Sequence, residues 1–122
     1  MRKQLVLFLS VLLVPLVLFA YDPRMDLLES GDFDSLLLYS RNTLIERGDS
    51  AENLFFLGAA YHGMGRRKLS DIAFESSLEH EDQTYRMSSY IANYYRETGQ
   101  EQKLFDLYTA MAESQFTILP AT

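Results

Sequence analysis

The sequence predicts an all-α protein, a short α-solenoid of antiparallel helix pairs that follows an N-terminal hydrophobic helix. Three observations lead to this prediction. After residue 20, Val and Ile are scarce, and apolar residues recur at spacings of three and four, which is typical of amphipathic helices. Gly31, Gly65 and Gly99 follow one another at intervals of 34 residues. A constant interval of this length is typical of helical repeats. Without its first residues the chain has about 100 residues, enough for one small core.

Composition excludes several classes of protein. The chain of 122 residues contains no cysteine and has a formal net charge of −6. The lack of cysteine excludes a disulfide framework, thiol catalysis and cysteine-ligated metal centres. The acidic balance argues against nucleic acid as a partner, because a phosphate backbone needs basic side chains to neutralise it.

Residues 1–20 have the features of a secretory signal peptide. Arg2 and Lys3 precede an almost wholly apolar stretch, and Ala20 is the small residue after which cleavage is expected. An uncleaved membrane anchor is the first alternative, although a helix over residues 5–21 would be about 25 Å long, which is slightly short for a bilayer core of about 30 Å. A cytosolic core helix is the second. With either a signal or an anchor, the rest of the chain is exported to a periplasmic or other extracytoplasmic location, and an anchor would tether it to the inner membrane.

Helix boundaries follow from caps and helix breakers. Asp22 can cap a first helix that begins at Pro23 and ends at Gly31. Asp49 and Glu52 have the spacing of a capping box, which would open the third helix. Pro120 cannot continue a helix, so residues 115–122 are expected to form a tail. The expected helices cover about residues 23–31, 33–47, 50–63, 68–79, 83–98 and 100–114.

Other residues of similar type recur at the same interval of 34 residues. Pairs of residues separated by this interval include Gly58 and Ala92, Tyr61 and Tyr95, and Phe74 and Tyr108. The small residues should let paired helices approach closely, and the aromatic residues should fill the space between helices.

This pattern resembles the tetratricopeptide repeat, a helix–turn–helix unit of about 34 residues. Leu54, Leu57, Gly58 and Tyr61 match the first half of its motif, and Phe74 stands where its second helix carries an aromatic residue. The resemblance is closest over residues 50–82, good over 84–111 and weak over 22–49. It implies about two full repeats and one degenerate repeat within residues 21–114.

The resemblance also implies a concave face on the leading helices, which in this family commonly holds a peptide or helix of another protein. The positions of this sequence that fall on that face are Glu52, Phe55, Ala59, His62, Arg86, Ser89, Asn93 and Arg96. Phe55, flanked by His62 and arginines, suits an extended segment with one apolar anchor and some acidic character. The alternative is that Phe55 belongs to the core and packs against the leading helix of the first repeat.

No motif predicts an enzyme, a cofactor or a metal site. The segment 63–68 superficially resembles a phosphate-binding loop, but it lacks both the preceding strand and the Gly-Lys-Ser/Thr ending. Residues 79–82 are of metal-ligating types, but neighbours at a helix end cannot converge on one ion.

We therefore expect an exported scaffold or adaptor of a bacterial cell envelope that binds protein segments through its concave face. The alternatives are a membrane-anchored structural subunit of a larger complex and a self-associating module that forms a homo-oligomer. Self-association is considered because about three repeats are usually needed to close a core. The tail, with Phe116, Ile118 and Leu119, is a candidate contact for it, and the alternative is that these residues fold back over the sixth helix.

Overall fold

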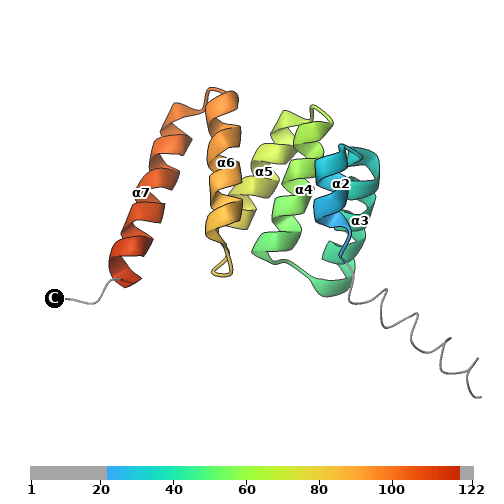
Figure 1. The fold of residues 1–122 in the computed structure, drawn as a ribbon, viewed down its shortest axis with the longest axis horizontal. Helices are drawn as coiled ribbons and strands as arrows, with labels where there is room; N and C mark the ends of the chain where they lie inside the picture. The colour runs from blue at the N-terminus through green and yellow to red at the C-terminus, as the bar shows by residue number, and fades with distance from the viewer. Residues whose placement is uncertain (1–21, 119–122) are drawn as a thin grey trace, which may run out of the picture.

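The computed structural model describes residues 22–118, with side chains up to residue 114. In this part of the chain every regular element is a helix, and helices adjacent in sequence pack side by side, from α2 and α3 at one end to α7 at the other (Figure 1). The helices are α2 (Arg24–Ser30), α3 (Phe33–Arg47), α4 (Ala51–Gly63), α5 (Arg67–Leu78), α6 (Tyr85–Glu97) and α7 (Glu101–Ile118). The expected N-terminal helix over residues 1–20 lies outside the described residues.

The predicted boundaries agree with these helices to within two residues, except at the end of the chain. There, α7 continues to Ile118 and takes in the first residues of the expected tail. One predicted cap is wrong: Ser50, and not Asp49, caps α4, because its side chain accepts a hydrogen bond from the Asn53 amide. The equivalent cap of α6 is Thr84, one repeat interval further on. The N-cap of α2 is Pro23 and not the expected Asp22, although the Asp22 carboxylate just before it accepts the Arg24 amide at 3.0 Å.

Three similar turns connect α2 to α3, α4 to α5 and α6 to α7. Gly31, Gly65 and Gly99 have φ angles of 76°, 74° and 70°, the left-handed conformation expected from their spacing. In each turn the amide after the glycine bonds back to a helix carbonyl, at distances of 2.8 to 3.0 Å. The helix pairs therefore share one local geometry at a constant interval along the chain, and this agrees with a helical repeat.

The tightest packing is between α4 and its neighbours α3 and α5. A Cβ atom at Gly58 would lie 2.6 Å from the Phe74 ring, so only glycine allows this ring to lie against α4. The Ser70 hydroxyl donates to the Gly58 carbonyl at 2.9 Å, and the Ser77 hydroxyl donates to the Ala51 carbonyl at 2.7 Å. Small serines on α5 therefore both permit the close approach and bond across it.

The α6–α7 pair joins this body mainly through aromatic side chains. The ring of Phe74 lies 4.8 Å from that of Tyr94 and 6.2 Å from that of Tyr90. Of the aromatic residues expected between helices, Phe74 and Tyr95 are buried and Tyr61 is half-buried, but Tyr108 is 44% exposed. Tyr108 takes the position of Phe74 in the last pair, where no further helix within the described residues covers it.

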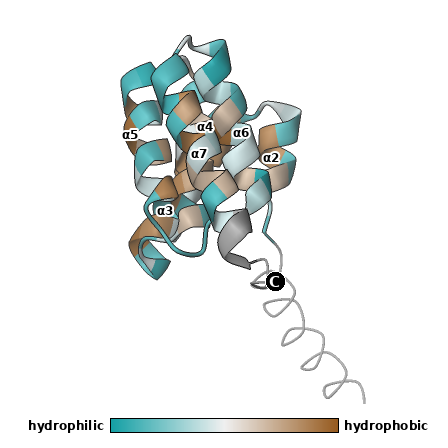
Figure 2. Ribbon diagram, turned by 90° about the vertical axis from the view of Figure 1, so that its left-hand side faces the viewer, coloured by the Kyte–Doolittle hydropathy of each residue, from teal (hydrophilic) through white to brown (hydrophobic). Residues whose placement is uncertain are grey.

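Figure 2 views the stack along its long axis and colours each residue by its hydropathy. In that view α3 and α5 lie on one side, and α2 and α6 lie on the other. The core runs between them and gathers residues from every described helix except the short α2, whose apolar side chains are partly buried against it. This arrangement places α2, α4 and α6 together, and they form the site described next.

Candidate protein-binding groove

An apolar groove of about 660 Å³ lies where α2, α4 and α6 come together. Its floor and walls are formed by Met25, Leu28, Phe33, Phe55, Phe56, Met87 and Tyr90. Glu29, Glu52, His62, Thr84 and Arg86 stand among them. A groove of this volume, apolar with a few polar groups, is typical of binding sites.

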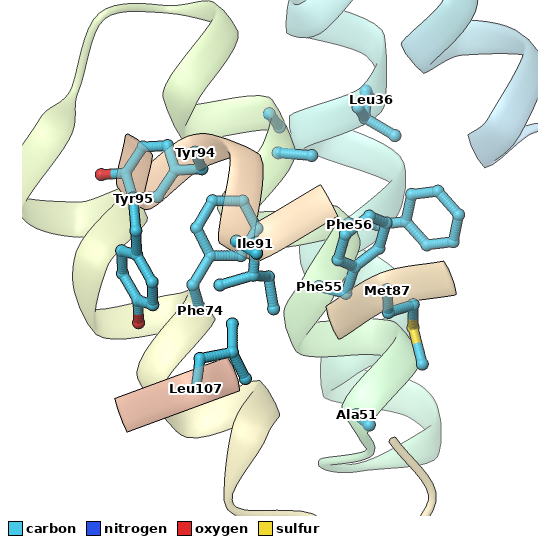
Figure 3. Close-up of a cluster of buried hydrophobic side chains, with 13 residues drawn as sticks. Leu36, Ala51, Phe55, Phe56, Phe74, Met87, Ile91, Tyr94, Tyr95 and Leu107 are labelled. Atoms are coloured by element: carbon cyan, nitrogen blue, oxygen red, sulfur yellow. The ribbon is translucent and has the colours of Figure 1, made fainter. Parts of the chain in front are cut away.

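Phe55 forms part of the floor and is core at the same time. Its side chain is 3% exposed, and its ring contacts Phe56 at 5.2 Å, Tyr90 at 5.1 Å and Phe74 at 6.0 Å. These partners lie on α4, α6 and α5, so the ring packs within the stack, and Figure 3 shows Phe55 among the buried side chains of the core. Phe55 therefore belongs to the core, as the alternative interpretation expected, and its aromatic neighbours lie on α4, α5 and α6. A ligand can touch at most one edge of this ring.

A buried arginine fixes one wall of the groove. Arg24 is 3% exposed, and its guanidinium lies 4.7 Å from the centre of the Phe56 ring. Nη1 donates to Asn53 Oδ1 at 2.7 Å, and Nη2 donates to Asp22 at 2.8 Å and to Glu52 at 3.0 Å. A buried charge is tolerated when it is fully hydrogen-bonded in this way. Arg24 thus ties the start of α2 to α4.

The same network sets the charge of Asp22. Burial alone would raise the pKa of Asp22, but the hydrogen bonds and the positive charge of Arg24 outweigh it, and the pKa lies below its usual value of 3.8. Asp22 is therefore ionised at neutral pH. Because a lowered pKa stabilises the fold above the usual value, this contribution is lost only as the pH falls below about 4.

The rim of the groove carries opposite charges on opposite helices. Glu52 is held by Arg24, and His62 Nε2 lies 3.9 Å from a Glu97 carboxylate oxygen. Arg86 on α6 and Glu29 on α2 are exposed and form no ion pair among the described residues. These two side chains can therefore meet charges on a ligand.

The predicted site residues divide into two sets. Glu52, Phe55, His62 and Arg86 line the groove. Ala59 is completely buried and Ser89 is half-buried. Asn93 and Arg96 are exposed away from the groove, where Arg96 donates to Asn93 Oδ1 at 2.7 Å and also to the Tyr108 hydroxyl. The structure therefore brings together four of the eight predicted residues.

Apart from Phe55, the predicted site residues did not include the apolar side chains that form the floor of the groove. Met25 and Leu28 were assigned to a degenerate first repeat, although their spacing of three along α2 gives them a shared face. Phe33 reaches the groove because a Cβ atom at Gly63 would lie 2.2 Å from its ring, so this glycine admits it. Only the packing of α3 against α4 reveals that contact.

Comparison of the chain with protein family models, with curated proteins and with solved structures found no match. None of the helices between residues 22 and 118 combines the length and the apolar character needed to cross a membrane. In the same part of the chain, no three potential metal-ligating side chains come together. The arrangement of the groove is therefore the main guide to function.

Proposed function

We propose that the protein is an exported scaffold or adaptor that binds a segment of another protein in the groove between α2, α4 and α6. In this proposal the helix pairs form a short α-solenoid of the tetratricopeptide type, with two full repeats and one degenerate repeat, and the groove is its concave face. The observation that carries the proposal is the apolar groove itself, because its lining comes from the leading helix of every pair.

The chemistry of the lining indicates the kind of segment that fits. Met25 and Met87 are flexible and polarisable, so they can adapt to apolar side chains of different shapes. Arg86, which has no ion-pair partner among the described residues, favours an acidic residue beside the apolar anchor. A segment of this type uses buried apolar contacts for affinity and the rim charge for orientation.

The proposed location depends on residues 1–20. A basic start, an apolar stretch and Ala20 favour export, with cleavage after Ala20 or retention as an anchor in the inner membrane. A periplasmic or other extracytoplasmic location follows in both cases. The mass of the mature protein from its native cells distinguishes cleavage from retention.

Site-specific photocrosslinking tests the groove. A photoreactive amino acid in place of Arg86 should form a crosslink to one defined partner in native cells, whereas the same amino acid in place of Lys68 should not. Lys68 is the matched control, since it is an exposed basic residue on α5 and does not line the groove. Equal crosslinking at both positions, or at neither, would contradict the proposal.

Self-association is a second candidate function, and the end of the stack favours it. Phe105 is 65% exposed and Tyr108 is 44% exposed on α7, whereas Phe74, the equivalent of Tyr108, is completely buried. Contact with a second copy would cover these rings. Analytical ultracentrifugation should then show an oligomer that Phe105→Glu dissociates, and a wild-type monomer at all concentrations would exclude this function.

A further inference from the structure

We propose that a second pocket, on the other side of the first turns of α6, docks a protein segment that combines an apolar anchor with a lysine or arginine. The pocket has a volume of about 840 Å³ and is distinct from the groove. Thr84 borders both, but Arg86 and Met87 face the groove, whereas Tyr85 and Ser88 face the second pocket. This inference goes beyond the proposed function, because it concerns a different surface.

The pocket exists because α5 and α7 do not pack directly on each other in its vicinity. Figure 1 shows α6 between α5 and α7, and the two outer helices are bridged by the ion pair of Lys103 with Glu75. Apolar side chains of all three helices form the walls, namely Leu78, Tyr85, Tyr95, Leu107, Ala110 and Met111. Tyr85 is 69% exposed, so an apolar ligand would cover a large aromatic surface.

The charge of the pocket indicates a basic partner. Glu75, Glu81 and Asp106 line it, and Lys103 is the one basic residue among its lining residues. Lys103 is already engaged, since it pairs with Glu75 and lies 5.8 Å from the centre of the Tyr95 ring. The carboxylates of Glu81 and Asp106 therefore give the pocket an excess of negative charge, which attracts a cationic segment and repels an anionic lipid surface.

Gln83 in the lining is held in a fixed position. Gln83 borders the pocket, and its Nε2 donates to the carbonyl and hydroxyl of Ser77 at 2.9 and 3.0 Å. These bonds fix the amide, but its Oε1 is buried and receives no hydrogen bond from the described residues. Because this oxygen is enclosed by protein, a cationic group of the partner is expected to meet the carboxylates of Glu81 and Asp106 instead.

The apolar walls argue that the ligand is a protein segment and not an inorganic cation. A hard cation needs converging oxygen ligands, and no three potential ligands converge within residues 22–118. An amphipathic segment matches both the apolar walls and the carboxylates of the rim. With a second partner in the groove, α6 would lie between two bound proteins.

Selection from a random peptide library, with the full chain as target, tests this inference. We expect a class of peptides that carries apolar anchors beside lysine or arginine. Ala110→Trp, which fills the pocket, should weaken their binding about tenfold or more. Ala112→Trp is the matched control, since Ala112 is also exposed on α7 but does not line the pocket. Peptides that bind in the groove between α2, α4 and α6 should bind both variants equally. A failure of this inference can therefore be distinguished from a failure of the proposed function.

Reversal of one negative charge in the pocket provides a second test of the inference. Glu81→Lys should weaken the binding of this peptide class about tenfold. Glu46→Lys changes the net charge equally on the distant helix α3 and should leave binding unchanged. Helical circular dichroism verifies that each variant is folded. The inference is overturned if no selected peptide is sensitive to Ala110→Trp, if the sensitive peptides are acidic, or if both charge reversals weaken binding alike.

Discussion

Three buried serines of the core differ in whether their hydroxyl groups form hydrogen bonds. Ser40, Ser70 and Ser77 are all completely buried. The hydroxyls of Ser70 and Ser77 donate to carbonyls of α4, whereas the Ser40 hydroxyl has no hydrogen-bond partner among the described residues. A buried hydroxyl stabilises a fold only when it is bonded, since it has lost its hydrogen bonds to water.

Replacement of two of these serines by alanine should therefore have different effects. Ser77→Ala removes the bond between α5 and α4 and should lower the free energy of unfolding by about 1 kcal/mol. Ser40→Ala removes an unbonded hydroxyl and should leave that free energy unchanged or raise it by about 1 kcal/mol. Urea denaturation of both variants measures the difference, and an equal loss in both would show that Ser40 has a partner in solution.

The buried tyrosines Tyr94 and Tyr95 should make the stability of the fold depend on pH. Burial raises the pKa of Tyr94, and its hydrogen bond to the Asp71 carboxylate raises it further, to about 12. Burial likewise raises the pKa of Tyr95 to about 12, with further contributions from the negative charges of Glu75 and Asp71. The unfolded chain releases these protons near pH 10, before the folded chain does. The neutral phenols therefore stabilise the fold fully below pH 10, and this contribution is lost between pH 10 and about 12.

The free energy of unfolding should thus fall between about pH 10 and about pH 12. Tyr94→Phe has no phenol to ionise and should show a smaller fall over the same range. Tyr85→Phe is the matched control, because Tyr85 is 69% exposed, and it should follow the wild type. Urea titrations at several pH values measure this, and identical pH dependence in wild type and Tyr94→Phe would contradict the assignment to Tyr94.

At the scale of helices and turns, the sequence predicted what depends on local interactions. Gly31, Gly65 and Gly99 end helices because a left-handed residue is needed there, and nothing distant alters that need. The cap of α4 was misplaced by one residue because Asp49 and Ser50 are both good caps. Asp82 helps to resolve the choice, since its carboxylate accepts the Ala51 amide at 3.2 Å from a distant part of the chain. Such a contact has no signal in local spacing.

Substitution of Gly58 tests how much the close approach of α4 and α5 contributes to the stability of the fold. In an exposed helix, glycine to alanine would stabilise by about 1 kcal/mol. Here a Cβ atom would lie 2.6 Å from the buried Phe74 ring. Overpacking of this kind costs about 1–3 kcal/mol, so Gly58→Ala should lower the melting temperature.

A double-mutant cycle with Phe74 provides the control. Phe74→Leu alone should destabilise the protein, but Gly58→Ala should cost less in the Phe74→Leu background, because the smaller side chain leaves room for the new methyl group. Additive effects of the two substitutions would mean that the ring is not what Gly58 accommodates.

At the scale of the whole molecule, the candidate site could be predicted only in part. The regular interval between the glycines identified which helices lead each pair, and this was sufficient to place Glu52, His62 and Arg86 on one surface. It did not indicate how far apart successive pairs stand. The rings of Tyr90 and Tyr94 set that distance, bury Phe55 and leave pockets on both sides of α6. Such spacing depends on side-chain packing between distant segments.

Hydrogen bonds to one carboxylate add to the aromatic packing that attaches α6 and α7 to the rest of the stack. Asp71 on α5 accepts hydrogen bonds from the Tyr94 hydroxyl and from Gln100 Nε2, the latter at 3.1 Å. Arg67 adds a bond to the Thr98 carbonyl at 2.8 Å, and Lys103 pairs with Glu75. By contrast, α3, α4 and α5 share a close-packed core. In stacked helix pairs, the pair with the weaker interface opens first.

Hydrogen exchange measured by mass spectrometry should reveal this difference. In the wild type, amides of α4 should exchange most slowly and those of α7 fastest among the helices α3 to α7. Asp71→Ala removes the acceptor of Tyr94 and Gln100, so it should accelerate exchange in α6 and α7 while α3 and α4 keep their protection. Asp106→Ala is the control, because Asp106 is exposed on α7 and its hydrogen bond comes from Gln102 of its own helix. Equal acceleration in all helices of Asp71→Ala would mean that the stack unfolds as a single cooperative unit, and both pockets beside α6 would then be as rigid as the core.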